Sequence, residues 1–223
     1  MNTEPGRGEL LVDVGAQRPG PGTGHTLAGT VTALGPGVDP ELRGRTVVTR
    51  TGRGRPDARI VVTASTVVAL PDGIDAARAA VLFDDAGTAL AALERTPVRR
   101  GEDVLVLPAA DGPGALLVRL LADAGARVVG AARGEQATRL ARELGAAQVV
   151  DHGHRDWVAQ VHALLPRGPA VVFDGAGGTI GRAAAWLVAE GGRYDSYGTA
   201  LGPAPDLGPC EPRARRITVT RSP

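Results

Sequence analysis

The sequence predicts an α/β fold in which a doubly wound parallel sheet follows a β-rich segment. Two observations carry this prediction. From Asp103 onward, apolar strands alternate with helical segments, which is the pattern of a parallel sheet covered by helices on both faces. Before residue 75, short apolar or alternating runs lie between clusters of glycine and proline. The 223 residues, 43% of them hydrophobic, suffice for one large core or two small ones.

The β-rich segment predicts a small barrel or rolled sheet. Its expected strands are 9–14, 27–34, 45–51, 59–63 and 67–70. A Pro-Asp-Gly turn at 71–73 follows, and residues 75–95 then carry a helical apolar stripe. This helix should link the two parts of the chain. We therefore expect a β-rich domain at 1–82 and a second domain at 83–223 that contains the linking helix and the parallel sheet.

The second part is expected to form six strands with helices between them. These strands are predicted at 103–107, 127–132, 147–151, 170–174, 192–197 and 217–220. The helix after the first strand carries leucines at helical spacing, at positions 116, 117, 120 and 121. A continuous apolar strand, a turn, an amphipathic helix and a second strand form a nucleotide-binding unit.

The turn AADGPG in this unit stands where the Rossmann dinucleotide-binding fingerprint belongs. In that fingerprint, three glycines make the tight turn, let the backbone approach the pyrophosphate and let the helix pack closely on the strand. Ala109, Asp111 and Gly114 hold these three positions. The sequence therefore predicts cofactor-binding residues at Ala109, Asp111, Gly112, Pro113 and Gly114, within a Rossmann-type domain.

Asp111 departs from the fingerprint and has two interpretations. Its carboxylate puts a negative charge where two phosphates would lie, and this charge opposes dinucleotide binding. Alternatively, Asp111 caps the helix that follows, because Asp is a strong N-cap and Pro113 suits the first helical turn. An internal anion would then occupy the phosphate site. The glycines at 112 and 114 favour the dinucleotide.

The end of the second strand of the parallel sheet indicates which dinucleotide would bind. An NAD site has an Asp or Glu there that accepts hydrogen bonds from the ribose hydroxyls. In this chain the strand ends at Ala131 and Ala132, and Arg133 follows. Arginine suits a 2′-phosphate, so the predicted cofactor is NADPH. The alternative is that Arg133 is a solvated loop residue.

The composition excludes several classes of function. All 25 basic residues are arginine, so Schiff-base chemistry on a lysine is excluded. Cys210 is the single cysteine, which excludes an intramolecular disulfide and a zinc site of several thiolates. With a net charge of +1 and both signs interspersed, no nucleic-acid partner is expected. The sequence has no signal-peptide pattern or long apolar run, so we expect a cytoplasmic protein with no membrane contact.

Seven segments, in order, carry a family resemblance over nearly the whole chain. One is the fingerprint region, and the others read GHTLAGTVTALGPGVD, GRTVVTRTG, VVALPDGIDAARAAVLFDDAGTALAAL, ARELGAAQVVD, VVFDGAGG and GGRYDSYG. Together they resemble the medium-chain dehydrogenase/reductase superfamily, on its zinc-independent quinone oxidoreductase side. The chain resembles a shortened member, because only the ten residues from Gly15 to Gly24 follow the first strand and the sequence stops after the sixth strand of the parallel sheet.

The resemblance implies a reduced GroES-like β domain, a Rossmann-type domain and NADPH-dependent reduction of a quinone, an enone or a related small conjugated carbonyl. The zinc-dependent branch of the superfamily places a metal-binding His in a Gly-His-Glu sequence. This chain reads Gly24-His25-Thr26 and has no cysteine nearby. We therefore predict that no metal is bound.

Four side chains are catalytic candidates, each with a structural alternative. His25, on the turn into a strand, is a candidate general acid or base, or else a histidine satisfied by the backbone. Asp84 and Asp85 lie in the linking helix where the family lines its cleft; a carboxylate there acts as a base if its pKa is raised, or the pair is a solvated polar face. Tyr197 follows the fifth strand and is a candidate donor to a carbonyl. The remaining histidines are expected at the surface: His152, His154 and His162.

Two classes of function remain open. The first is an NADPH-dependent oxidoreductase that delivers a hydride to a small conjugated carbonyl. The second is a redox-silent member of the same fold that catalyses acid/base chemistry, such as cyclisation, dehydration or isomerisation, without a bound dinucleotide. A non-catalytic scaffold is a third reading, because a fold does not fix a function.

The last predicted strand indicates a partner. Residues 217–220 would form an exposed, β-branched edge, which pairs with another chain unless it is shielded. Arg215, Arg216 and Arg221 flank this strand. The resembled family joins the sheets of two subunits through their last strands, and closed two-fold dimers are the commonest homo-oligomers. We therefore expect a homodimer that depends on residues 213–221.

Overall fold

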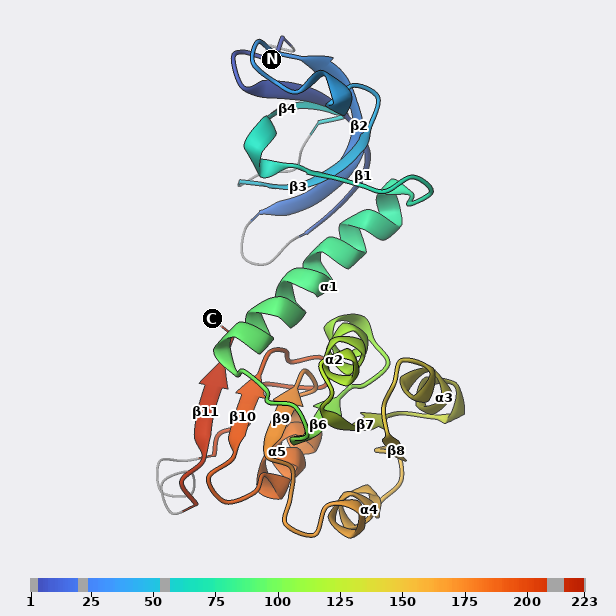
Figure 1. Cartoon of the computed structure of the whole chain (residues 1–223), viewed down its shortest axis with the longest axis vertical. Coiled ribbons are helices and arrows are strands. Elements are labelled where there is room, and N and C mark those ends of the chain that lie inside the picture. Colours follow the sequence, from blue (N-terminus) through green and yellow to red (C-terminus); the bar gives the residue numbers. More distant parts are fainter. Residues whose placement is uncertain (1–3, 20–23, 53–56, 208–214, 223) are drawn as a thin grey trace. The chain divides into compact units, whose positions relative to one another are not determined.

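The computed structural model in Figure 1 describes residues 4–19, 24–52, 57–207 and 215–222. The chain divides into two compact units, residues 1–85 and 86–223. Helix α1 (Ala76–Arg95) contributes residues to both units. Cys210 and residues 213 and 214 of the predicted dimer contact lie outside the described residues.

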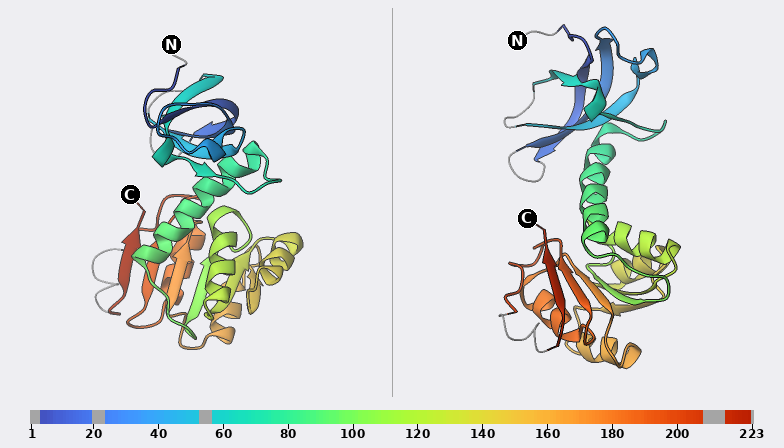
Figure 2. Two further views of the ribbon diagram at one scale, coloured as in Figure 1. Left: turned by 45° about the horizontal axis from the view of Figure 1, so that its top comes forward. Right: turned by 60° about the vertical axis from the view of Figure 1, so that its left-hand side comes forward.

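The first unit contains an antiparallel sheet of five strands in the order β4-β1-β2-β3-β5, drawn from blue to cyan in Figure 2. Its strands are β1 (Glu9–Pro19), β2 (His25–Leu34), β3 (Thr46–Thr51), β4 (Arg59–Thr63) and β5 (Val68–Ala69). Two 3-10 turns lie at Pro40–Leu42 and Ala64–Thr66. Alternate residues of the strands bury one apolar face, which forms a core around Leu10, Val12, Leu27, Val31 and Val47.

The first two strands are longer than the sequence predicts, and His25 lies in a strand instead of a turn. β1 continues to Pro19, which pairs with His25 at the start of β2. Two register shifts interrupt this pairing, and the second falls at Gly15. Such a shift bends a strand and breaks the alternation of apolar and polar residues that reveals it. The predicted ten-residue connection from Gly15 to Gly24 is therefore wrong, because its first half is strand.

The second unit is built on a parallel sheet of six strands in the order β11-β10-β9-β6-β7-β8. The strands are β6 (Asp103–Leu107), β7 (Arg127–Ala132), β8 (Gln148–Asp151), β9 (Val171–Asp174), β10 (Arg193–Ser196) and β11 (Thr218–Arg221). The chain builds outward from β6 to β8 on one side and then returns to β9 on the other side. The strand order therefore reverses between β6 and β9, and ligands of open α/β sheets bind at the carboxyl ends of the strands at such a point.

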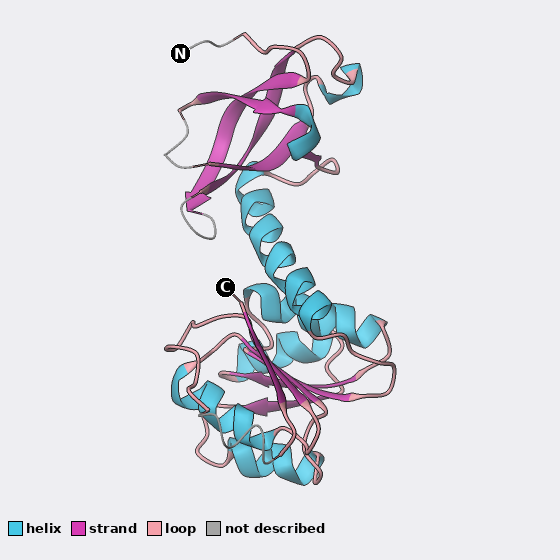
Figure 3. Ribbon diagram, turned by 90° about the vertical axis from the view of Figure 1, so that its left-hand side faces the viewer, coloured by secondary structure: helices cyan, strands magenta, loops and turns pink. Residues whose placement is uncertain are grey.

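Helices cover both faces of the parallel sheet, which Figure 3 shows close to edge-on. α2 (Gly112–Asp123) and α3 (Glu135–Glu143) pack on one face, where they share a core with Val104 and Val106 of β6. α4 (Trp157–Leu164) and α5 (Gly178–Leu187) pack on the other face, against Leu105 and Leu107. Burial on both faces explains why β6 reads as a continuous apolar run.

The predicted fold class is confirmed. Each of the six strands predicted for the parallel sheet is present within one residue of its expected bounds, and the helices lie between them. The strands of a buried parallel sheet leave the strongest sequence signal, since both of their faces must be apolar.

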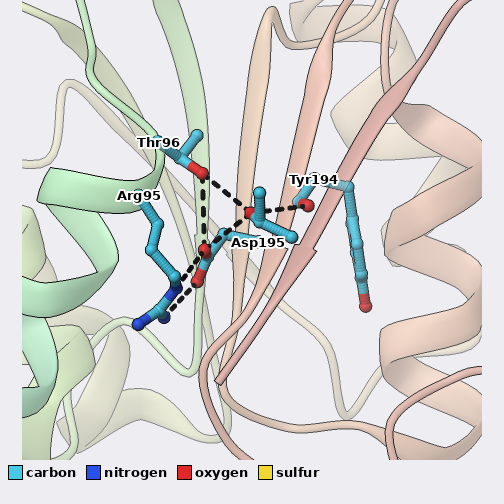
Figure 4. Close-up of polar contacts among 5 residues, drawn as sticks. Arg95, Thr96, Tyr194 and Asp195 are labelled. Atoms are coloured by element: carbon cyan, nitrogen blue, oxygen red, sulfur yellow. Dashed lines mark hydrogen bonds and ion pairs between the residues drawn. The ribbon is translucent and has the colours of Figure 1, made fainter. Parts of the chain in front are cut away.

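A buried carboxylate joins the end of α1 to the last two strands of this sheet (Figure 4). Asp195 in β10 is 0% exposed, and its oxygens accept hydrogen bonds from Nε and Nη2 of Arg95 at 3.1 and 3.0 Å. The hydroxyls of Thr96 and Thr220 donate to Oδ2 of Asp195 at 3.3 and 2.7 Å. Since these donors come from α1, from the residue after it and from β11, one side chain holds three segments together.

We expect Arg95→Met to lower the free energy of unfolding by about 3–5 kcal/mol, because it leaves the Asp195 carboxylate buried without its charge partner. The matched control is Arg119→Met, which breaks an exposed ion pair with Asp123 one helical turn away and should cost about 0.5 kcal/mol or less. Urea unfolding followed by circular dichroism measures both changes. Equal, small losses in the two variants would contradict the anchoring role of Asp195.

Candidate functional site

A cavity of about 300 Å³ opens at the carboxyl ends of β6, β9 and β10, next to the point where the strand order reverses. Among the described residues that line it, Asp111 alone carries a charge. The volume lies at the lower end of the range for small-molecule sites. The cavity is lined by Thr88, Pro108, Asp111, Gly112, Pro113, Gly175, Tyr197, Gly198, Thr199 and Ala200.

A larger cavity of about 690 Å³ lies at the opposite, amino-terminal edge of the sheet. Asp103 and Arg127, at the starts of β6 and β7, line it together with residues between α4 and β9. We assign the functional site to the smaller cavity. Ligands of open α/β sheets bind at the carboxyl ends of the strands, where the loops and the positive ends of the helices meet.

The turn that precedes α2 has the backbone geometry that the glycine fingerprint requires. Gly112 has a φ of 47°, in the left-handed region that favours glycine. A Cβ atom on Gly114 would lie 1.8 Å from the carbonyl oxygen of Pro108, so a side chain at this position would push the helix away from the strand. A Cβ on Gly130 of β7 would lie 2.9 Å from Cβ of Ala109. Glycine at 114 and 130 thus permits the close packing that the fingerprint predicts.

Asp111 occupies the N-cap position of α2, but its side chain makes no capping hydrogen bond. The backbone N–H groups of Gly114 and Ala115 donate instead to its carbonyl oxygen, at 3.0 and 3.4 Å. The residue is exposed. The interpretation in which the Asp111 carboxylate binds the helix N–H groups is therefore wrong. Its negative charge lies in the lining of the cavity.

Tyr197 packs beneath this cavity. It is 7% exposed, and its hydroxyl donates to the carbonyl oxygen of Leu107 at 3.3 Å. A Cβ on Gly175 would lie 2.4 Å from the ring, and a Cβ on Gly114 would lie 2.9 Å from the hydroxyl oxygen. Burial raises the pKa of Tyr197, and the carboxylate of Asp174 raises it further. The hydroxyl is therefore neutral, and it would have to leave Leu107 to donate to a substrate carbonyl.

The corner of the sheet beyond β7 holds Arg133, which the sequence marks as the 2′-phosphate residue. Arg133 is exposed and makes no hydrogen bond or ion pair with any residue that the structure describes. His152, at the neighbouring end of β8, is 8% exposed, so the prediction that it lies at the surface is wrong. Its backbone N–H donates to Ala132 at 2.9 Å and continues the pairing of β7 and β8. Burial lowers the pKa of His152.

In the first unit, Asp84 anchors α1 to the antiparallel sheet. Arg18, Thr26 and Arg50 pair across β1, β2 and β3 and reach the same carboxylate. The hydroxyl of Thr26 donates to Oδ1 at 2.6 Å, Nη2 of Arg50 lies 3.1 Å from Oδ1, and Nε of Arg18 lies 3.7 Å from Oδ2. The guanidinium of Arg50 also lies 5.4 Å from the centre of the Phe83 ring. Asp84 is 6% exposed, so it is not part of a solvated face.

Asp85 and His25 are the other candidates in the first unit. Asp85 is half-buried, and burial raises the pKa of its carboxyl, with Arg18 lowering it and Asp84 raising it. His25 is half-buried, and its Nδ1 is buried without a hydrogen-bond partner among the described residues. A buried polar atom of this kind is commonly paired with water or with a ligand. Asp84 therefore has a structural role, because three side chains surround its carboxylate. Asp85 and His25 have no such set of partners among the described residues.

Asp174 precedes Gly175 of the cavity lining and holds the turn after β9, a role that the sequence does not indicate. It ends β9, is 0% exposed, and its Oδ1 accepts the backbone N–H groups of Ala176 and Gly177 at 2.8 and 3.0 Å. Its Oδ2 accepts the hydroxyl of Tyr194. A Cβ on Gly181 would lie 2.2 Å from Oδ2. The sequence signal for this turn is an Asp that ends an apolar strand and precedes Gly-Ala-Gly-Gly.

Comparison with known proteins agrees with this architecture. The zinc-binding dehydrogenase family matches residues 112–222, a range that begins with α2 and ends just after β11. The quinone oxidoreductase of Pseudomonas aeruginosa is 31% identical over 185 residues, which are 82% of this chain and 57% of that protein. The chain belongs to the medium-chain dehydrogenase/reductase superfamily. Within it, the chain is a quinone oxidoreductase-like member, and it spans little more than half the length of that relative.

Solved structures of the superfamily match both units. A quinone oxidoreductase of Pseudomonas syringae pv. tomato superposes with a TM-score of 0.80 at 27% identity, over 100% of this chain and 75% of that one. A mycobacterial protein solved in complex with NADPH gives 0.79 at 28% identity, over 100% and 76%. Part of a mycocerosic acid synthase-like polyketide synthase of Mycobacterium tuberculosis is 28% identical over 180 residues, 80% of this chain and 8% of that one.

Over the described ranges, no three His, Cys, Asp or Glu side chains gather closely enough to hold a metal ion. In the same part of the chain, no helix combines the length and the apolar character needed to cross a bilayer.

Proposed function

We propose that the chain is an NADPH-dependent oxidoreductase that reduces a small conjugated carbonyl compound, such as a quinone or an enone. One observation carries the proposal: the cavity lies where the strand order reverses, beside a glycine turn that brings α2 against the strand. The similarity to two quinone oxidoreductases and to a protein solved with NADPH supports it. We further propose that the reaction takes place in the cytoplasm. We also propose that it needs no metal, because Thr26 replaces the Glu of Gly-His-Glu and its hydroxyl donates to Asp84.

The residues present fit this cofactor through their backbone and through one arginine. Gly112 and Gly114 permit a close approach to the N-terminal end of α2, where the helix dipole favours phosphate. The guanidinium of Arg133 is free to hold a 2′-phosphate. Pro113 at the start of the helix needs no acceptor for a backbone N–H. Asp111 opposes the fit by its charge, so we expect weaker binding than an uninterrupted fingerprint would give.

Bound NADPH would supply the hydride. The protein would hold the carbonyl compound, exclude water and supply the proton that completes the two-electron reduction. We propose Tyr197 for the proton, because its neutral hydroxyl belongs to the lining of the cavity. Asp85 and His25, in the first unit, remain predictions from the sequence. We propose an anchoring role for Asp84 instead of its predicted role as a base, since three side chains already surround it.

A second function rests on Asp111. If its charge keeps the dinucleotide out, the same cavity would serve acid/base chemistry such as a cyclisation, a dehydration or an isomerisation. Asp111, whose exposed carboxylate makes no capping hydrogen bond, and Tyr197, whose hydroxyl is neutral, line the cavity. They would be its acid/base groups.

Cofactor titration separates the two functions. We expect NADPH to bind at least about ten-fold more tightly than NADH, a difference of about 1.4 kcal/mol, and Arg133→Ala to remove this preference. The control is Arg139→Ala, which removes an exposed arginine of α3 that pairs with Glu135 and should leave the preference unchanged. Fluorescence of the reduced cofactors measures the affinities. Equal affinities would refute the role of Arg133, and binding of neither cofactor would favour the redox-silent function.

Asp111→Gly should strengthen NADPH binding about two- to thirty-fold, because the phosphates then no longer share with a carboxylate the helix N-terminus, whose interaction with an anion is worth about 0.3–2 kcal/mol. Asp111→Asn isolates the charge from the shape of the side chain. Since the side chain makes no capping bond, the loss of stability should be limited to the interaction of the exposed carboxylate with the helix dipole, about 0.3–1 kcal/mol. Asp123→Asn, at the other end of α2, is the control. Unchanged or weaker binding after both substitutions at 111 would show that Asp111 does not oppose the cofactor.

We also propose that the protein is a homodimer joined through β11. This strand lies at the edge of the parallel sheet and pairs with β10 alone among the described strands. The backbone N–H groups of Thr218 and Ser222 donate to the carbonyl oxygens of Gly192, just before β10, and Ser196, at its end, at 3.0 and 2.9 Å. Because N–H groups alternate along a strand, that of Val219 faces the open edge. Pairing of two such edges would satisfy both subunits at once.

Val219→Pro tests this dimer, because it removes an N–H from the open edge and leaves the donors to β10 in place. We expect the wild-type protein to be a dimer by light scattering and the variant to be a monomer that retains its far-UV circular dichroism spectrum. A monomeric wild type, or a variant that stays dimeric, would rule out pairing through β11.

A further inference from the structure

We propose that Asp151 is a positioning residue for Arg133, and that it thereby sets the preference of the chain for an adenosine that carries a 2′-phosphate. This inference rests on the proposed function, because the 2′-phosphate is the partner that function gives to Arg133. Asp151 ends β8, and Arg133 follows β7 at the same edge of the sheet. Asp151 would not touch the phosphate itself.

The carboxylate of Asp151 ties together the two turns at this corner. Its Oδ2 accepts the backbone N–H of Gly134 at 3.0 Å, which is the residue directly after Arg133. Its Oδ1 accepts the backbone N–H of Gly153 at 2.7 Å, in the turn after β8. Gly134 has a φ of 82°, a conformation that side-chain-bearing residues rarely adopt, and it precedes α3. One side chain therefore fixes the backbone on which Arg133 is mounted.

The stem of Arg133 runs across the second of these turns. A Cβ on Gly153 would lie 3.5 Å from Cγ of Arg133 and 3.8 Å from its Nε. The same Cβ would lie 2.9 Å from Oδ1 of Asp151. Glycine at 153 thus leaves room for both the arginine stem and the carboxylate. The direction of the Arg133 side chain depends on the position of a turn that Asp151 holds.

Asp151 fixes this geometry without neutralising the arginine. No ion pair joins Asp151 to Arg133 within the described part of the chain; Nε2 of His154 lies 3.7 Å from Oδ2 of Asp151. The hydrogen bond from Gly153 lowers the pKa of Asp151, so the carboxylate is ionised at neutral pH and remains an acceptor. Because its oxygens face backbone N–H groups, Asp151 is also not disposed as the acid that accepts ribose hydroxyls in an NAD site.

The experiment uses adenosine fragments, so that Asp111 and the pyrophosphate site do not affect the result. Isothermal titration of the full chain with adenosine 2′,5′-bisphosphate and with adenosine 5′-monophosphate gives the ratio of the two affinities. The variants are Asp151→Ala, Asp151→Asn, Arg133→Ala and the double substitution of 151 and 133 by alanine. Asp156→Asn is the control. Asp156 is an exposed acid five positions after Asp151, and its carboxylate accepts a hydrogen bond from Gln160.

We expect the wild type to favour the bisphosphate at least about ten-fold and Asp151→Ala to reduce this ratio about five-fold or more, with the monophosphate affinity changed less than about two-fold. Asp151→Asn, which keeps one acceptor, should fall between. The double variant should have the ratio of Arg133→Ala alone, because the two residues act through one contact. Circular dichroism confirms folding, and Asp151→Asn carries the test if the alanine variant does not fold.

The outcomes separate this inference from the proposed function. A wild type that binds both fragments equally, and binds no NADPH, overturns the proposed function and this inference with it. A wild type that prefers the bisphosphate, with the preference intact in both variants of Asp151, overturns the positioning role alone. A double variant that loses more of the ratio than Arg133→Ala also overturns it, since Asp151 would then act independently of Arg133.

Discussion

The close contact between the first turn of α2 and the backbone after β6 is the constraint on which the cavity depends. Gly114 lies so near Pro108 that a single added carbon would overlap its carbonyl oxygen. This contact sets the depth of the cavity and brings the positive end of the helix dipole to its wall. Tyr197 fills the space below, against the backbone of Gly175. Glycine at these positions is therefore a requirement of packing as much as of ligand binding.

Acidic side chains serve as anchors at four places in this fold. Asp84 holds α1 to the antiparallel sheet, Asp195 holds α1 to β10 and β11, and Asp151 and Asp174 hold turns at the carboxyl ends of strands. Each accepts hydrogen bonds from backbone N–H groups, hydroxyls or arginine, so burial of the charge is compensated. Asp111 and Asp85 differ from them, because neither makes a hydrogen bond with a described residue. Of these two acids, Asp111 lies in the lining of the cavity.

The parallel sheet could be predicted from sequence because both faces of its strands are buried and because each turn carries glycine. The same reasoning missed the second half of β1, where the register shift at Gly15 breaks the alternation. It also could not distinguish Asp84 from Asp85: the two are adjacent in the sequence, and Asp84 is recognised as an anchor only when Thr26 and Arg50 are seen beside it. Partners that are 58 and 34 positions away leave no local pattern.

Around the cavity, the fingerprint turn and Arg133 could be found from sequence, because they follow strands directly. Asp151 and the buried position of His152 could not, since both depend on the backbone pairing between β7 and β8 continuing past the strand end. The capping role considered for Asp111 was plausible from residue type alone. It fails because the side chain makes no hydrogen bond to the helix N–H groups, and the rotamer that decides this is not specified by the sequence.

The central claim is that a dinucleotide binds at the carboxyl ends of β6, β9 and β10. Mapping of backbone amide chemical shifts during a titration with NADPH tests it most directly. The account predicts that the largest changes fall in the glycine turn at 112–114, in the loop at 198–200 and at Arg133 and Gly134. Changes centred instead on the opposite edge of the sheet, around Asp103 and the connection at 164–170, would contradict it.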